Sequence, residues 1–294
     1  SPTFSVVIPT YNQADYLRAA LKSVLDQTLE DFEVIVVNNH STDHTLEVVK
    51  ELEDPRIQVR NFRNNGVIGT GRNTGIRAST GEYVAFLDSD DTWYPTKLEK
   101  IAEAIKSDSQ VGLLCHDQDM VRDGQVELRT HYGPPAGYRG SMYDYVLGAG
   151  NGPSTSATVV ARRYLYQVGY FSEDPAFVTV EDYELWLRLA QVCRFRFLGD
   201  VLGTHRFHDA SSSANAERQL RAGLAVLAKL SREVDVDSQG VSRREAAFRK
   251  RAIRYHCANA YYVAGRNYQR RGMLRKTLPR YLRAVATWPF HKRV

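Results

Sequence analysis

Cysteine is scarce in this chain of 294 residues: there are three, Cys115, Cys193 and Cys257, and they lie far apart. An odd number of widely spaced cysteines does not form a disulfide framework. We therefore expect buried thiols in a reducing compartment, not a metal site built from cysteines.

Long hydrophobic runs are also missing. The richest ones, at 34–37 and 83–87, have only the length of a strand, whereas a membrane span needs about 18 apolar residues or more. No secretory signal is recognisable at Ser1-Pro2. The expected location is the cytoplasm, or the inner face of the membrane as a peripheral protein.

What remains is the composition of a soluble globular protein. Hydrophobic residues make up 43% of the chain and charged residues 25%, which excludes disordered, collagen-like and low-complexity classes. Acidic residues are absent from Arg249 to Val294, where ten Arg and three Lys occur. Residues 1–248 carry 26 basic and 34 acidic groups, so an acidic body precedes a basic tail.

The first 117 residues alternate between β-branched runs and segments of helical apolar spacing. The pattern predicts strands at 4–8, 32–37, 57–61, 83–87 and 111–115, and helices at 14–25, 42–52, 71–78 and 96–105. Apolar runs without alternation are typical of strands covered on both faces. They predict an α/β fold with a mostly parallel, Rossmann-like sheet flanked by helices.

Later residues change character. A stretch rich in Gly, Pro and Tyr at 133–153 predicts a long loop containing a short helix at 142–147. A strand at 156–161, a helix at 182–191 and a pair of strands around 194–206 are expected next. We expect one domain over 1–212 and a basic helical C-terminal appendage over 213–294.

The most specific feature is a group of carboxylates that follows the expected fourth strand. Asp88, Asp90 and Asp91 lie within four residues, and a hard divalent cation shared with a diphosphate relieves their repulsion. The alternative is a solvated acidic turn that caps the next helix. Polar segments at 9–12, 38–43 and 64–75 are expected at the same sheet edge, where open α/β sheets bind ligands.

In their order and spacing, these segments resemble glycosyltransferase family 2, whose members have the GT-A fold, over roughly residues 4–210. The resemblance implies a set of nucleotide-binding residues: Pro9, Thr10, Tyr11, Asn38, Asn39, Asp43, Arg72, Asp88 and Ser89. Members of the family often have two acidic residues where this chain has Asn38 and Asn39. Since an amide can donate or accept a hydrogen bond, the identity of the nucleotide base stays open.

The resemblance also implies metal ligands. Asp88 and Asp90 match the DXD motif that holds the cation bridging the donor's phosphates, with Asp90 as the first ligand and Asp88 as a second ligand or a ribose contact. His208 would complete the site and would tilt a Mg²⁺ or Mn²⁺ preference toward Mn²⁺. A loop histidine without metal is an equal alternative.

A second acidic pair, Glu181 and Asp182, opens an expected helix. By resemblance Asp182 would be the general base that takes the acceptor's proton, and Glu181 would support it or bind the acceptor hydroxyl. The alternative is that both carboxylates only complement the helix dipole.

These expectations describe a metal-dependent, inverting enzyme of polysaccharide biosynthesis that moves a sugar from a nucleotide-diphosphate sugar to a hydroxyl of a glycan or lipid-linked acceptor. The basic tail indicates binding to an anionic membrane surface. A contact with another subunit is the alternative, and binding to nucleic acid is not expected. Two other functions stay open: a nucleotidyltransferase, and a non-catalytic nucleotide or carbohydrate binder. The stretch Thr10 to Ala14 contains no Lys or Arg, which counts against binding of a triphosphate.

Overall fold

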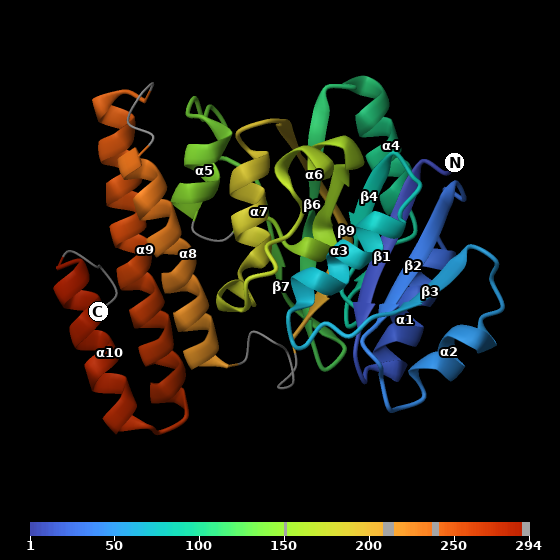
Figure 1. Cartoon of the computed structure of the whole chain (residues 1–294), viewed down its shortest axis with the longest axis horizontal. Coiled ribbons are helices and arrows are strands. Elements are labelled where there is room, and N and C mark those ends of the chain that lie inside the picture. The colour runs from blue at the N-terminus through green and yellow to red at the C-terminus, as the bar shows by residue number, and fades with distance from the viewer. Residues whose placement is uncertain (150–151, 208–214, 237–240, 290–294) are drawn as a thin grey trace.

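The computed structural model describes residues 1–149, 152–207, 215–236 and 241–289 (Figure 1). The strands are β1 (Phe4–Thr10), β2 (Phe32–Asn38), β3 (Ile57–Asn61), β4 (Tyr83–Phe86), β5 (Thr92–Trp93), β6 (Val111–Arg122), β7 (Gln125–Thr130), β8 (Thr158–Ala161) and β9 (Arg194–Arg206). The helices are α1 (Ala14–Leu25), α2 (Thr45–Glu51), α3 (Ile68–Ala78), α4 (Lys97–Ser107), α5 (Met142–Ala149), α6 (Arg162–Val168), α7 (Glu181–Leu189), α8 (Ala216–Val236), α9 (Arg243–Arg270) and α10 (Leu274–Thr287), with short 3₁₀ turns at Thr155–Ala157 and Pro175–Phe177.

All described strands belong to one sheet with the order β3-β2-β1-β4-β8-β6-β9-β5, and β7 pairs with β6. Strands β3, β2, β1 and β4 are parallel to one another. Strand β8 is antiparallel to both β4 and β6, while β9 runs parallel to β6. The α/β class is confirmed, and the parallel part of the sheet is the part that the alternation of the first 117 residues predicted.

Helices cover both faces of the sheet, which explains the continuous apolar runs. Every residue of β1 and β2 is buried. On one face, Leu17 and Leu21 of α1 pack with Ile101 of α4 against Val6. On the other face, Ile76 of α3 packs in a cluster with Val7 and with Trp186 of α7.

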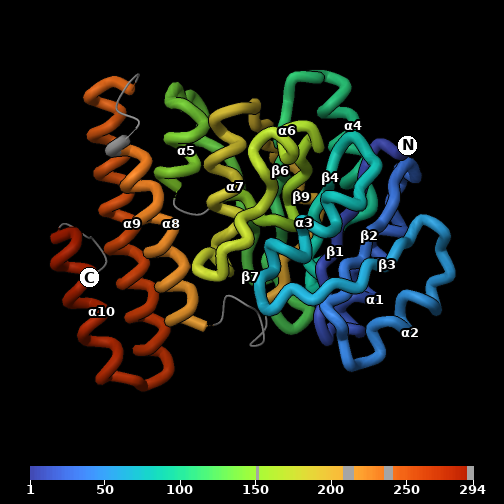
Figure 2. Tube along the Cα trace, viewed as in Figure 1, coloured from blue at the N-terminus to red at the C-terminus, as the bar shows by residue number. Residues whose placement is uncertain are grey.

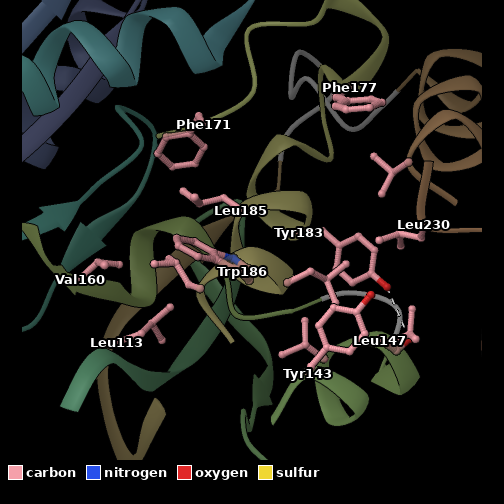
Figure 3. Close-up of a cluster of buried hydrophobic side chains, with 14 of the residues drawn as sticks. Leu113, Tyr143, Leu147, Val160, Phe171, Phe177, Tyr183, Leu185, Trp186 and Leu230 are labelled. Atoms are coloured by element: carbon pink, nitrogen blue, oxygen red, sulfur yellow. Dashed lines mark hydrogen bonds between the residues drawn. The ribbon is translucent and has the colours of Figure 1, made fainter. Parts of the chain in front are cut away.

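The second of these clusters extends from the sheet into the C-terminal helices. Trp186 and Leu185 share it with Leu147 of α5, Leu230 of α8 and Ile253 of α9, and Figure 3 shows several of these side chains converging. The indole N–H of Trp186 donates to the carbonyl oxygen of Pro153 at 2.9 Å. Helices α8, α9 and α10 stand side by side at the end of the molecule opposite β2 and β3 (Figure 2).

The expected strand pair around residues 194–206 is wrong, because β9 is one strand that runs through Gly199 and Asp200. Those two residues suggest a turn, but they lie in an irregularity of the β6–β9 register, where His116 and Asp117 oppose Leu198 and Val201. Extra residues on one strand of a pair are absorbed as a bulge. Strand β7 and helix α6 were not predicted at all.

Among the described residues, no helix combines the length and the apolar character that crossing a membrane requires.

Candidate active site

The parallel register brings three of the expected polar segments to one edge of the sheet. Thr10 lies opposite Asn38 at the ends of β1 and β2, and Val7 lies opposite Phe86 at the end of β4. The chain leaving β1 therefore meets the segments that follow β2 and β4, as the sequence predicted. Tyr11 is 54% exposed at this edge.

Of Asn38 and Asn39 at the end of β2, only Asn39 has a side-chain group without a partner among the described residues. The amide of Asn38 donates to Asn61 Oδ1 at 2.9 Å, and its oxygen accepts the Ser41 N–H at 3.0 Å. Asn39 accepts the Asn64 N–H at 2.9 Å, which assigns its oxygen and leaves its NH₂ group, within the described part of the chain, without an acceptor. Asn38 therefore holds the edge together, while Asn39 presents a hydrogen-bond donor.

Asp43 holds two helix starts in place. Its carboxylate accepts from the Ala14 N–H at 3.0 Å and from the Thr45 N–H at 3.2 Å. Burial acts to raise the pKa of Asp43, but the hydrogen bonds from Thr45 and Ala14 outweigh it and lower that pKa. Asp43 therefore holds the chain at this edge in place, and its contact with the nucleotide, which the sequence suggested, stays a prediction.

The glycines of α3 let the helix approach its neighbours closely. A Cβ on Gly75 would lie 2.3 Å from Val7 Cγ1, and one on Gly69 would lie 2.6 Å from the Ser172 carbonyl oxygen. The helix begins at Ile68, earlier than the expected residue 71. The Gly-rich pattern thus serves packing of α3 against β1, and this packing sets the position of Arg72.

Arg72 joins the two acidic motifs. Its Nη2 lies 2.6 Å from Asp88 Oδ1, and its Nη1 lies 2.5 Å from Glu181 Oε1. The guanidinium is 3% exposed and its Nε has no partner among the described residues. Burial acts to lower the pKa of Arg72, but the charges of Asp88 and Glu181 raise it overall, so the group is a permanent buried cation.

Asp182 lies next to this ion-pair network, in the first turn of α7. One oxygen accepts the Tyr183 N–H at 2.7 Å and the other accepts the Thr155 hydroxyl at 3.2 Å. Burial, followed by repulsion from Glu181, raises the pKa of Asp182 to about 6, although Arg72 acts against this. A half-buried carboxylate with that pKa can accept a proton at neutral pH.

The DXD segment divides into an outward and an inward part. Asp88 Oδ1 is held by Arg72, while Oδ2 has no hydrogen-bond partner among the described residues. Asp91 is 1% exposed and accepts the Arg206 N–H at 2.8 Å and His205 Nδ1 at 3.2 Å. Burial opposes protonation of His205, but Asp91 raises its pKa to about 9. Asp91 therefore fastens β5 to β9, Oδ2 of Asp88 is available to a ligand, and Asp90 is half-buried.

A divalent cation fits this donor set. Within the described part of the chain, no three His, Cys, Asp or Glu side chains gather into a metal site of their own. Mg²⁺-type sites commonly use one or two carboxylates and take their other oxygens from substrate phosphates and water. Asp88 and Asp90 supply that number of carboxylates. His208, the expected third ligand, lies outside the described residues.

A polar support beneath Asp88 was missed by the sequence analysis. The Asp88 N–H donates to Ser156 Oγ at 3.0 Å. The Ser156 carbonyl in turn accepts from Trp93 Nε1 and Lys97 Nζ, both at 2.9 Å. Lys97 is completely buried, which pushes its pKa well below the ordinary value. No local sequence signal indicates this arrangement, because Ser156 lies 59 residues or more from its partners Trp93 and Lys97.

Both acidic motifs open on one cavity of about 830 Å³, whose lining includes Asp88 and Asp182. Ser89 is buried, and its hydroxyl donates to Gln13; it contributes to the loop, not to this cavity. Arg72, which was expected to reach the nucleotide, is paired with Asp88 and Glu181 and is not among the lining residues; its contact with the nucleotide stays a prediction. The site can hold a cation-bound diphosphate and a proton acceptor side by side.

Known proteins are similar to this chain in sequence. A family model described as Glycosyl transferase family 2 matches residues 5–168. An uncharacterized glycosyltransferase of a Nostoc species is 32% identical over 72% of this chain and 67% of its own length. A Rickettsia felis glycosyltransferase is 31% identical over 72% of this chain and 35% of its own length, so the chain spans only about a third of that relative.

A third relative has a more specific name. It is the UDP-Glc:alpha-D-GlcNAc-diphosphoundecaprenol beta-1,3-glucosyltransferase WfaP of Escherichia coli, 28% identical over 74% of this chain and 82% of its own length. The chain therefore belongs to glycosyltransferase family 2. It is a glycosyltransferase, which favours glycosyl transfer over the nucleotidyltransferase and non-catalytic alternatives.

Solved structures share the fold. S. aureus TarS 1-349 in complex with UDP-GlcNAc matches with a TM-score of 0.67 and 19% identity, over 98% of this chain and 91% of that one. The mannosyltransferase PcManGT from Pyrobaculum calidifontis, solved with GDP-Man and Mn²⁺, matches with a TM-score of 0.59 and 19% identity, over 98% of this chain and 76% of that one. The GT-A fold is thus confirmed.

Proposed function

We propose that this glycosyltransferase is metal-dependent and inverting, and that it moves a sugar from a nucleotide-diphosphate sugar to a hydroxyl of a glycan or lipid-linked acceptor. The observation that carries the proposal is the shared cavity of the two acidic motifs, which Arg72 ties together through Asp88 and Glu181. A phosphate-holding group and a proton acceptor face one space, as a single displacement requires.

In that displacement, Asp182 accepts the proton of the acceptor hydroxyl. The hydroxyl oxygen forms a bond to the anomeric carbon while the bond from that carbon to the diphosphate oxygen breaks, and the electron pair leaves with the nucleoside diphosphate. Because attack and departure occur on opposite faces of the sugar, one displacement inverts the anomeric configuration. Glu181 is fixed by Arg72 and the Thr179 N–H, so we assign it a positioning role beside Asp182.

Asp88 and Asp90 are the proposed metal ligands. A divalent cation bound there neutralises the charge that develops on the departing diphosphate. Mn²⁺ and Mg²⁺ both suit two carboxylates, and the Mn²⁺ in PcManGT supports divalent metal use in this fold.

The nucleotide is proposed to lie over the ends of β1 and β2. Tyr11 is exposed there, Asn39 presents its amide donor, and the Thr10 hydroxyl is buried without a partner among the described residues. An amide donor matches a carbonyl oxygen on the base edge. Pro9 is the last residue but one of the fully buried strand β1 and precedes these residues at the edge.

The proposal is tested by incubating the chain with a panel of UDP-, GDP- and dTDP-sugars, with Mn²⁺, Mg²⁺ or a chelator. We expect cleavage of at least one donor that depends on the added metal and releases a nucleoside diphosphate. No metal-dependent binding or cleavage of any donor would contradict it. For the inverting mechanism, product NMR should show the opposite anomeric configuration to the donor.

We also propose that the basic C-terminal region contacts an anionic surface, as its 13 basic and zero acidic residues from Arg249 onward suggest. The diphosphoundecaprenol acceptor in the name of WfaP supports a lipid-linked acceptor at such a surface. Nucleic acid is not part of this proposal.

A further inference from the structure

The cavity beside Asp182 has a wall that the acidic motifs do not provide. Its lining continues onto the C-terminal helices through two groups of residues: Ala216, Gln219, Leu220, Gly223 and Leu227 of α8, and His256, Asn259, Ala260, Val263, Ala264 and Asn267 of α9. Helices α8 and α9 stand beside α5 and α7 in Figure 1. The part of the chain that is distant in sequence from the donor motifs therefore encloses the space in front of the proposed base.

The described residues of this wall are mostly apolar, and its four polar side chains, Gln219, His256, Asn259 and Asn267, carry no charge. Asn259 and Asn267 are half-buried, and neither side chain has a hydrogen-bond partner among the described residues. Gln219 accepts the Thr179 hydroxyl at 2.9 Å, which leaves its NH₂ group to donate. Burial lowers the pKa of His256, so it too is neutral. Half-buried amides without partners are groups that a ligand can satisfy.

Charge is absent from the wall although the region is strongly basic. None of the 13 Lys and Arg residues from Arg249 onward is among the described lining residues, and the only carboxylates in the lining are Asp88 and Asp182. A phosphate or another anion would find no counter-charge on the helices, and the cationic His205 elsewhere in the lining is already paired with Asp91. The wall suits a neutral ligand rich in hydroxyl groups.

Another part of the cavity lining is aromatic. Tyr132, Tyr145, Phe197 and Phe207 line it, and the rings of Tyr145 and Phe197 meet edge to face with centroids 6.0 Å apart. Aromatic side chains together with a few hydrogen-bonding groups are the usual lining of a small-molecule site. Aromatic faces pack against the C–H faces of a pyranose ring.

We propose that the cavity between this aromatic wall and helices α8 and α9 binds an uncharged pyranoside of the acceptor, and that Asn259 and Asn267 determine which saccharide is accepted. The inference deepens the proposed function and rests on it, because Asp182 must face the hydroxyl that this saccharide presents. Any phosphate or lipid carried by the acceptor lies outside the cavity.

Gly223 offers a direct test. A Cβ placed on it meets nothing within 4 Å, so Gly223→Phe projects a ring into the cavity without an immediate clash. Ala228→Phe on the exposed side of the same helix is the matched control. The probes are p-nitrophenyl glucoside, galactoside and N-acetylglucosaminide, detected by saturation-transfer NMR and by transfer from the active donor.

We expect at least one probe to bind both the wild type and the Ala228→Phe variant. In Gly223→Phe the same probe should either give no saturation-transfer signal or be glycosylated at least tenfold more slowly. Asn259→Ala and Asn267→Ala should each raise the probe KM about 3- to 10-fold. Equal behaviour of Gly223→Phe and Ala228→Phe, or no contact of any probe with wild type, would overturn the inference. Donor hydrolysis by the wild type in the absence of acceptor reports on the proposed function separately.

A second surface is carried by α10, away from the cavity. Its apolar stripe, Leu274, Leu278, Leu282 and Val285, is 70%, 61%, 62% and 41% exposed. Spacings of four, four and three residues place these side chains on one face of the helix. Arg275 borders that face, and Lys276 and Arg283 lie further around the helix.

We propose that this apolar stripe inserts into an anionic lipid surface, with α10 lying flat on it. Exposed leucines bordered by Arg275, in a segment without any acidic residue, match an interfacial helix by both apolar area and charge. The proposed partner of the stripe is a membrane surface, and this proposal does not depend on the saccharide cavity.

Vesicle sedimentation tests this surface with the full chain. Phosphatidylglycerol–phosphatidylcholine vesicles should pellet the protein, and phosphatidylcholine alone should pellet at least tenfold less. Leu278→Gln with Leu282→Gln should abolish pelleting, whereas Val126→Gln with Leu128→Gln, an equally exposed apolar pair on β7, should not. Equal pelleting of the two double variants would overturn the proposal. So would a wild-type dimer in light scattering that only the α10 variant loses, because it would assign the stripe to a second copy.

Discussion

The guanidinium of Arg72 and the carboxylate of Glu181, 109 residues apart in the chain, lie 2.5 Å from each other and are almost completely buried. The same guanidinium also holds Asp88. One side chain therefore fixes the distance between the proposed metal site and the proposed base. Since a buried charge is tolerated only with its partners, the three groups form a unit.

Loss of Arg72 should destabilise the fold as well as abolish transfer. Arg72→Ala leaves Glu181 and Asp88 without their cation, and breaking a buried pair typically costs about 3–5 kcal/mol. Urea unfolding monitored by Trp fluorescence measures this loss. On the same helix, Arg77→Ala removes an exposed pair with Glu173, worth about 0–1 kcal/mol. A loss for Arg72→Ala no larger than that of Arg77→Ala would contradict the assigned role.

Replacing Asp182 by Asn should stabilise the protein above pH 6. The pKa of Asp182 is raised from 3.8 to about 6 by burial and by Glu181. Between pH 3.8 and about pH 6 the folded state binds the Asp182 proton more tightly than the unfolded state does. The free energy of unfolding of the wild type therefore falls as the pH rises through this range. The Asn variant lacks this loss and should gain about 1–3 kcal/mol at neutral pH.

Thermal unfolding with chelator at pH 4, 5, 6 and 7 checks this prediction. The difference between Asp182→Asn and wild type should be near zero at pH 4 and should grow through pH 6. Glu103→Gln, at a 61% exposed side chain, is the control and should show no such growth. A difference that is independent of pH would mean that Asp182 is not a strained carboxylate.

The pH dependence of glycosyl transfer should show the titration of Asp182. A general base acts only when deprotonated, so kcat/KM should rise about tenfold per pH unit below the Asp182 pKa of about 6 and level off above it. Asp182→Glu should keep a rising limb, shifted with its own pKa. A flat profile between pH 5 and 7 would count against Asp182 as the base.

Metal removal should weaken the binding of the nucleoside diphosphate. Calorimetric titration of the diphosphate product should show a Kd at least tenfold lower with Mn²⁺ than with chelator. Asp90→Asn should remove most of this gain, whereas Glu99→Gln, on the exposed side of α4, should retain it. Metal-independent binding in wild type would exclude Asp90 as a metal ligand.

The sequence predicted the parts of the fold that local pattern controls. The apolar runs of β1, β2 and β4 could be recognised as strands because both of their faces are covered. The parallel register of these strands brings Thr10, Asn38 and Asp88 to one edge of the sheet. The acidic motifs were found for the same reason, since each directly follows a strand or opens a helix.

Long-range contacts account for what the sequence could not predict. Nothing local shows that Asp43 is occupied by the backbone of Ala14, or that Asn38 is bonded to Asn61. The bulge that carries β9 through Gly199 depends on its pairing with β6. The contribution of α8 and α9 to the cavity depends on helix packing through Leu230 and Ile253, which no spacing rule indicates.

The central claim is that Asp182 performs proton transfer in the cavity where the donor diphosphate is held. The most direct test compares kcat and the donor Kd of wild type and Asp182→Asn under saturating Mn²⁺. A general base contributes about 10²- to 10⁴-fold, so kcat should fall by at least about 100-fold while the donor Kd changes less than threefold. An unchanged kcat, or a loss confined to donor binding, would contradict the account.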